Sequence, residues 1–236
     1  MPRVPDKTGG EGSKRVLAVD VGGTHVKFKL SPGSERREFD SDSKLSAAAM
    51  VAKVRKMTTD WTYDVVSVGF PGPVAGNRPV AEPHNLGKGW RGFDFAKAFG
   101  RPVRVVNDAA MQAIGSYQGG RMLFLGLGTG LGSAMILDGV VEPMELAHLT
   151  WRKGKSYEEL LGLSALKKAG KKKWRKRVAD AVGELVAALE PDYVILGGGN
   201  AEKLKSLPPL ARRGENDNAF IGGFRLWERG FGRGSD

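Results

Sequence analysis

The sequence predicts an α/β protein, and three observations carry this prediction. Short apolar runs of strand length alternate with helical segments between residues 16 and 196. Glycine-rich turns directly follow several of these runs, and the chain contains 34 glycines. The hydrophobic content of 41% is enough for a core. Strands that alternate with helices are typical of α/β architectures.

The expected strands share strand length and a high content of β-branched or aromatic residues. They lie at residues 16–20, 26–30, near 35–39, 63–70, 103–106, 122–127, 133–137 and 193–196. The strand at 133–137 is expected to pair with 122–127 as a hairpin and to close at Asp138-Gly139, a strong turn dipeptide.

The expected helices lie at residues 44–56, 93–99, 109–117 and 156–190. The first is rich in Ala, Leu, Met and Lys, and Ser43 is the expected N-cap. Pro-Gly-Pro at 71–73 predicts a turn, and residues 74–90 have the composition of a loop.

Composition limits the classes of protein that remain. The chain has 236 residues and no cysteine, which excludes disulfides and cysteine-ligated zinc. No run of about 18 apolar residues is present, so no membrane helix is expected. Residues 1–14 are polar and glycine-rich, lack the apolar region of a signal peptide and predict a disordered tail. These features favour a cytoplasmic protein.

The formal net charge of +11 is concentrated in one segment. Eight lysines and arginines lie between Lys167 and Arg177, with Trp174 among them. Such a run is either a solvated helix face or an electrostatic track for a long polyanion, because lysine binds phosphate as a point charge.

The segment Asp20 to Thr24 (Asp-Val-Gly-Gly-Thr) separates the first two strands. Glycines permit positive φ and let backbone N–H groups approach an anion, and a hydroxyl donates to phosphate oxygen. A lone carboxylate repels phosphate, so Asp20 is better suited to hold Mg²⁺. This pattern predicts a phosphate-and-metal hairpin; the alternative is a plain Gly-Gly turn with an incidental aspartate.

A second glycine-rich segment of the same type, Gly128 to Gly132, separates the strands at 122–127 and 133–137. Neither segment matches the P-loop or the dinucleotide fingerprint. Two such hairpins suggest two lobes that close on one polyphosphate group. Between them, Asn107-Asp108 ends a strand just before a helix, where ligands bind in α/β sheets. Asp108 either accepts a proton from an alcohol or caps the helix.

Seven motifs in this order resemble those of a sugar kinase of the ROK family, within the actin-like ATPase superfamily, and most closely its short polyphosphate glucokinase branch. The motifs are Asp20–Thr24, Gly69–Val74, Asn85-Leu86, Asn107–Ala109, Gly128–Gly132, Glu145–His148 and Gly197–Gly199. The resemblance spans residues 16–200 and implies a two-lobed, ribonuclease H-like fold with a central cleft. The lobe boundaries are then expected at 15–107 and 108–236.

The resemblance also implies a role for each matching residue. Asp108 is the general base for the 6-hydroxyl of glucose or a related hexose such as mannose, and Asp20 lies near Mg²⁺. The implied sugar ligands are Asn85, Asn107, Glu145 and His148, with a further carboxylate from Glu158 or Glu159, of which Glu159 is our prediction. The implied phosphate ligands are Gly22, Gly23, Thr24, Lys27, Gly128, Thr129 and Gly130, with Gly198 and Gly199 flanking adenosine when ATP is the donor.

Two departures from the family pattern matter. Most members have a cysteine-rich zinc loop after the Glu-x-Gly-His element, whereas this chain has no cysteine, so no zinc is expected. The glycine of that element is Ala147 here, which leaves the choice of sugar open. The phosphoryl donor is expected to be polyphosphate, ATP or both.

Other functions remain as alternatives. They are an ATP-only ROK hexokinase and a non-catalytic regulator that binds sugar or polyanion. A DNA-binding regulator would need a helix-turn-helix domain, for which the polar residues 1–14 leave no room. We expect a homodimer that binds small molecules, with polyphosphate along 167–177, and no membrane or specific nucleic-acid partner.

Overall fold

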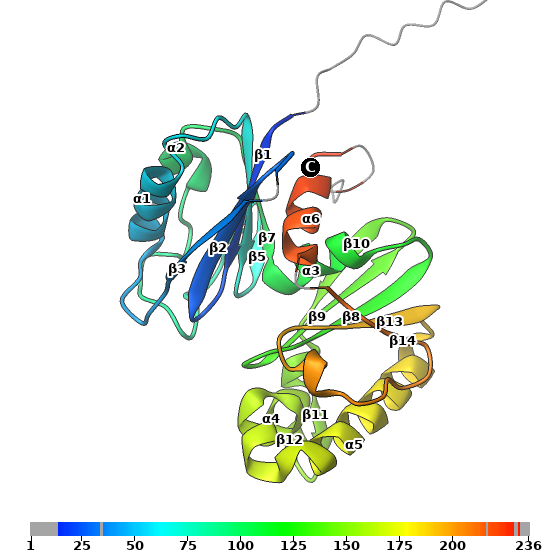
Figure 1. Cartoon of the computed structure of the whole chain (residues 1–236). Coiled ribbons are helices and arrows are strands. Elements are labelled where there is room, and N and C mark those ends of the chain that lie inside the picture. Colours follow the sequence, from blue (N-terminus) through cyan, green and yellow to red (C-terminus); the bar gives the residue numbers. More distant parts are fainter. Residues whose placement is uncertain (1–13, 34, 216, 229–230, 232–236) are drawn as a thin grey trace, which may run out of the picture.

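Two five-stranded sheets dominate the computed structural model, which describes residues 14–33, 35–215, 217–228 and 231 (Figure 1). The first sheet has the strand order β3-β2-β1-β4-β7. Strands β1 and β2 pair antiparallel, as do β2 and β3, whereas β4 runs parallel to both β1 and β7. The bounds are β1 Val16–Val21, β2 His25–Leu30, β3 Arg36–Asp40, β4 Val65–Phe70 and β7 Val103–Asn107.

The two faces of the first sheet carry side chains of different size. Leu17 and Val19 of β1 point into an apolar core, which helices α1 (Ala47–Met57) and α2 (Phe95–Phe99) complete on one side of the sheet (Figure 1). Ala18 of β1 and Ser67 of β4 face the other side. Their small size allows a helix backbone to approach the sheet there.

The second sheet has the strand order β10-β9-β8-β13-β14. Strands β8, β9 and β10 form an antiparallel meander, and β13 runs parallel to β8 and to β14. Helices α4 and α5 pack on this sheet around the fully buried Trp174. The bounds are β8 Arg121–Leu127, β9 Leu131–Leu137, β10 Val140–Met144, β13 Tyr193–Gly197, β14 Ala211–Arg213, α4 Tyr157–Leu161 and α5 Leu163–Leu189.

Helices α3 (Asp108–Ser116) and α6 (Asn218–Arg225) cross closely between the two sheets (Figure 1). A Cβ on Gly115 would lie 1.9 Å from the carbonyl oxygen of Asn218, so only glycine fits this crossing. Ser67 Oγ donates to the carbonyl of Gly223 at 2.6 Å, which anchors α6 to the first sheet.

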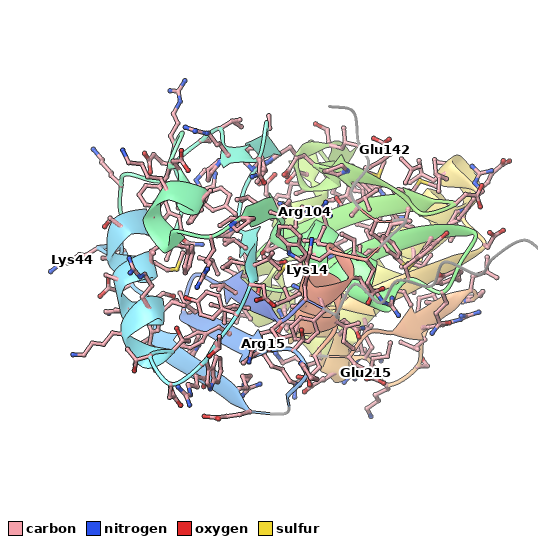
Figure 2. All side chains as sticks on the ribbon, turned by 90° about the horizontal axis from the view of Figure 1, so that it is seen from above. Lys14, Arg15, Lys44, Arg104, Glu142 and Glu215 are labelled. Carbon is pink, nitrogen blue, oxygen red and sulfur yellow. The ribbon has the colours of Figure 1, made fainter. Side chains whose placement is uncertain are left out.

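The end of α6 is held by residues of the first sheet as well. Arg104 of β7 lies near the centre of the molecule in Figure 2, with its guanidinium 4.6 Å from the ring centroid of Trp227. It also donates to the carbonyl of Leu226. The C-terminal segment therefore packs against the lobe that the chain forms first.

Short elements complete the fold. They are β5 Val74–Ala75, β6 Arg78–Pro79, β11 Thr150–Arg152, β12 Lys155–Ser156 and two 3₁₀ turns, η1 Leu146–His148 and η2 Ala201–Lys203. No helix among the described residues is long and apolar enough to cross a membrane. The tail predicted at 1–14 lies outside the described residues except Lys14, whose ammonium lies 5.6 Å from the Trp227 ring centroid.

Several expectations for local structure were wrong. The N-cap of α1 is Ser46 rather than Ser43, and its hydroxyl accepts from the Ala49 N–H at 3.3 Å. The predicted helix 156–190 is divided at Gly162, where α4 ends, and bends again at Gly170, which has φ 76°. Strands β10 and β14 and helix α6 were not predicted.

Candidate active site

Three parallel strands of the first sheet end at one edge and bring the predicted residues of the first lobe together. In the register, Asp20 of β1 is opposite Gly69 of β4, and Phe70 is opposite Asn107 of β7. A Cβ on Gly69 would lie 2.5 Å from the Cε of Met111 and 3.5 Å from the Cα of Asp108, both in α3. The absence of a side chain at Gly69 therefore lets the start of α3 lie against the strand next to Asp20.

Asp108 occupies the first position of α3 and is partly buried. Its Oδ1 accepts from the Ala109 N–H at 2.8 Å. The pKa of Asp108 is raised to about 7, mainly by burial and also by the charges of Asp20 and Glu145, while the hydrogen bond from the Ala109 N–H lowers it. A carboxyl that titrates near neutral pH is suited to act as a general base.

Asp20 is the second partly buried carboxylate at this edge. The pKa of Asp20 is raised to about 6, because the effect of burial exceeds the lowering effect of the charge of Lys27, its cross-strand neighbour. Among the described residues, no three histidine, aspartate or glutamate side chains converge as a metal site. The donor set fits Mg²⁺ in the mode in which one or two carboxylates and the substrate phosphates hold the ion.

The turn of the first hairpin is closed by backbone and side-chain bonds. Gly22 N–H donates to the carbonyl of His25 at 3.0 Å, and Ser41 Oγ donates to the carbonyl of Gly22 at 2.7 Å. Gly22 and Gly23 do not adopt positive φ, so that part of the expectation was wrong. A Cβ on Gly23 would instead lie 3.2 Å from the Cβ of Asn85. The absence of a side chain at Gly23 lets Asn85 lie close to the hairpin.

The hairpin of the second lobe approaches the same helix from the other side. Its turn, Gly128 to Gly130, connects β8 and β9, and Gly128 N–H donates to the carbonyl of Gly130 at 3.2 Å. A Cβ on Gly132 would lie 2.8 Å from the Cβ of Ala109, the residue after Asp108. The second hairpin is thereby packed against the N-terminus of α3, whereas the first hairpin is connected to that helix through the sheet edge, where Asp20 lies beside Gly69.

Glu158 and Glu159 have different surroundings. Glu159 is part of a capping box, in which its carboxylate accepts from the Ser156 N–H at 2.8 Å and its own N–H donates to Ser156 Oγ at 3.2 Å. Glu158 Oε2 accepts from the Leu131 N–H at 3.2 Å and lies against Gly130. Glu158 is therefore the carboxylate that faces the second hairpin.

The other predicted sugar ligands fall into two groups. Asn107 is the N-cap of α3, since its Oδ1 accepts from the N–H groups of Ala109 and Ala110 at 2.9 and 3.2 Å, and its Nδ2 donates to the carbonyl of Gly72. This asparagine, rather than Asp108, provides the side-chain N-cap. Glu145 and His148 lie on the exposed turn η1, with 3.8 Å between Oε2 and Nε2.

The third glycine segment, Gly197–Gly199, packs against the end of β8, next to the turn of the second hairpin. Gly198 has φ 79°, and a Cβ there would lie 2.6 Å from the carbonyl oxygen of Leu127. Asn200 is buried, and its Nδ2 donates to the carbonyl of Gly128 at 2.8 Å. Asn200 was not among the site residues predicted from the sequence, although its position directly after three glycines was a usable signal.

Two sheets that each carry a glycine hairpin, with Asp108 at the start of a helix between the sheets, form the two-lobed actin-like ATPase fold of sugar kinases. The chain belongs to the ROK family, whose family model matches residues 16–142. Structural similarity supports the fold across nearly the whole chain. The polyphosphate/ATP-glucomannokinase of Arthrobacter sp. strain KM superimposes with a TM-score of 0.77 at 22% identity, covering 89% of this chain and 97% of that one.

Two further relatives extend the comparison. The polyphosphate glucokinase of Mycobacterium tuberculosis (strain H37Rv) is 26% identical over 231 residues, covering 89% of this chain and 86% of the relative. A ROK family glucokinase from Streptomyces griseus, solved in complex with glucose and AMPPNP, superimposes with a TM-score of 0.74 at 15% identity. That alignment covers 90% of this chain and 98% of the Streptomyces chain.

Proposed function

We propose that this sugar kinase is a glucokinase that transfers a phosphoryl group from polyphosphate, ATP or both to the 6-hydroxyl of glucose. The observation that carries this function is the position of Asp108, with a pKa of about 7 raised in part by Asp20 of the first hairpin, at the start of the helix against which the second hairpin packs. The names of the mycobacterial and Arthrobacter relatives support the same donor and sugar classes.

In this mechanism Asp108 accepts the proton of the sugar hydroxyl as the bond to phosphorus develops. Phosphoryl transfer depends mainly on positioning and charge stabilisation, so a carboxylate base is sufficient. Backbone N–H groups of Gly23 and Thr24 in the first turn and of Thr129 and Gly130 in the second, with Lys27, hold the donor phosphates, since the N–H groups of Gly22 and Gly128 donate within the turns. Asp20 would hold Mg²⁺, which when bound supplies positive charge to the donor phosphates.

The sugar ligands of this proposal are Asn85, Glu145, His148 and Glu158. Glu158 replaces Glu159, because the capping box occupies the Glu159 carboxylate. Asn107 remains at the site, but its carboxamide holds the start of α3 and so positions Asp108. Hydroxyl groups donate and accept, and these side chains provide partners for both.

Polyphosphate is the expected main donor, and the basic segment of α5 is the reason. Arg175 and Arg177 donate to the carbonyls of Lys203 and Leu160, which leaves the lysines as the charges available to a ligand. These exposed lysines are Lys167, Lys168, Lys171, Lys172, Lys173 and Lys176. Gly198 and Gly199 remain the proposed adenosine contacts, so ATP is the expected second donor.

A coupled assay for glucose 6-phosphate tests the function directly. Purified protein with Mg²⁺ is supplied with glucose, mannose or another hexose, and with either ATP or polyphosphate. Product with polyphosphate supports the proposal, product with ATP alone favours an ATP-only hexokinase, and product with neither donor favours a sugar- or polyanion-binding regulator. The homodimer, the cytoplasmic location and the lobe boundaries at 15–107 and 108–236 stay predictions.

A further inference from the structure

A polar chain connects the second hairpin to the basic segment of α5. Asn200 donates through Nδ2 to the carbonyl of Gly128 at 2.8 Å, and its Oδ1 accepts from the ammonium of Lys203. The carbonyl of Lys203 in turn accepts from Arg175 Nε at 2.6 Å. Three consecutive contacts therefore lead from the proposed phosphate turn to α5.

The segment that carries Lys203 is held on both sides. Arg213 of β14 donates to the carbonyls of Ala201 and Leu204 at 2.8 and 3.0 Å. The backbone of Asn200 is also fixed, because its N–H donates to the carbonyl of Leu127 at 2.9 Å. The Lys203 ammonium is thus kept at one place relative to the turn, unlike an ordinary surface lysine.

The ammonium of Lys203 is bound by an uncharged acceptor, the carboxamide oxygen of Asn200. The lysine side chain is partly buried, and within the described part of the chain no carboxylate forms an ion pair with it. Partial burial of a cation without an anionic partner costs free energy. An anion that extends beyond the Gly128 turn would supply the missing charge.

We propose that Lys203 is the subsite that binds the polyphosphate donor where the polymer passes from the Gly128 turn toward α5, and that it determines the preference for polyphosphate over ATP. This inference rests on the proposed function, in which the Gly128–Gly130 turn holds donor phosphates. Beyond those phosphates ATP presents an uncharged adenosine, whereas polyphosphate presents further anionic units. Lys203 therefore distinguishes the two donors by charge.

The test compares Lys203→Gln with Lys205→Gln. Glutamine at 203 retains a donor for Asn200 Oδ1 and removes only the charge, and the exposed Lys205 provides the same charge change two residues away. Lys203→Gln is expected to raise the KM for polyphosphate about tenfold or more, the effect of one charge-assisted hydrogen bond. The KM for ATP is expected to stay within about threefold, as for loss of a surface charge.

Two controls keep the result decisive. Lys203→Arg retains the charge and is expected to preserve polyphosphate use, and a thermal melt checks that each variant is folded. Calorimetric titration with long-chain polyphosphate measures binding without turnover. If neither donor yields product, the proposed function fails, but weaker polyphosphate binding by Lys203→Gln than by Lys205→Gln still supports the subsite.

Two results would overturn the subsite. Equal weakening of polyphosphate by Lys203→Gln and Lys205→Gln would mean that only long-range charge matters. Equal weakening of ATP and polyphosphate by Lys203→Gln would mean that the lysine acts on phosphates common to both donors.

Discussion

Burial and the negative charge of Asp20 together raise the pKa of Asp108 to about 7. Asp20 lies near the end of β1 and Asp108 begins α3 directly after β7, and Gly69 of β4, which has no side chain, lies beside both of them. A bound Mg²⁺ at Asp20 would relieve the repulsion between them. The proton affinity of the proposed base is therefore raised in part by the residue proposed to hold the metal.

The first prediction concerns catalysis. Asp108→Asn is expected to lower kcat by about 10²–10⁴-fold, the usual loss when a general base is removed. Glucose binding, measured by calorimetry, is expected to persist, because the other sugar ligands are retained. Asp138→Asn, an exposed turn residue, serves as the matched control. Near wild-type kcat in Asp108→Asn would show that this carboxylate is structural.

The second prediction concerns stability in the absence of Mg²⁺. The folded-state pKa of Asp108 is raised from 3.8 to about 7, so the native state holds the proton more tightly than the unfolded chain. The wild type therefore loses stability as the pH rises from about 4 to about 7. Asp108→Asn lacks this loss and is expected to be more stable by on the order of 1–3 kcal/mol at pH 8.

Urea unfolding of both proteins in EDTA at pH 4.5 and pH 8 measures this difference. The gain from Asp108→Asn is expected to be small at the lower pH and to grow with pH. An equal gain at both values would mean that the carboxyl is not perturbed, and would remove the electrostatic basis for its role as base.

The third prediction concerns the contact between β9 and the start of α3. Gly132→Ala places a methyl group 2.8 Å from the Cβ of Ala109, so β9 and the start of α3 must separate. A loss of about 1–3 kcal/mol in stability is expected from overpacking, together with reduced kcat because Asp108 moves. Gly183→Ala, where no atom lies within 4 Å of the added Cβ, is expected to leave kcat unchanged. Full activity in Gly132→Ala would show that this contact does not position the base.

The fourth prediction concerns the basic segment of α5. Replacing Lys171, Lys172 and Lys173 by Gln is expected to weaken polyphosphate more than ATP, and most strongly at low salt. Exposed charges are screened beyond about 8–10 Å at 0.1–0.15 M salt. The measurement is the KM of each donor at two ionic strengths.

A charge-matched control replaces three lysines of the first lobe. Lys44 projects away from the molecule at the end opposite the second sheet (Figure 2), and Lys56 and Lys97 are also exposed. Their replacement by Gln is expected to leave both donors unaffected. An equal loss of polyphosphate affinity in the two triple variants would mean that the basic segment of α5 is a solvated helix face and not a polyphosphate-binding site.

Most of the fold could be predicted because the strands of both sheets are apolar and follow each other closely. The elements that were missed are those in which the usual signals conflict with tertiary packing. Strand β10 is short, largely exposed and contains Pro143, a residue normally confined to sheet edges. Helix α6 contains Gly222 and Gly223, which predict a turn but here allow the backbone of α6 to approach α3 and β1.

The residues of the candidate site could be selected by motif, but their hydrogen-bond partners could not. Glu158 and Glu159 are adjacent in sequence, and only the geometry of α4 assigns one to a capping box and the other to the second hairpin. In the same way, only the structure shows that Asn107 is the N-cap of α3, which leaves Asp108 as the candidate base. Such assignments depend on the direction of each side chain, which sequence spacing alone does not determine.

The packing of α6 on the first sheet has a consequence for the order of folding. Ser67 and Gly223, joined by a hydrogen bond, are 156 residues apart in the chain. Contacts of such separation are slow to form, so the face of the first sheet that carries Ala18 and Ser67 stays uncovered until the second lobe has been synthesised. The first lobe is therefore completed only when the end of the chain has been synthesised, and truncation before residue 218 is expected to destabilise the lobe made first as well as the helix α3 that α6 crosses.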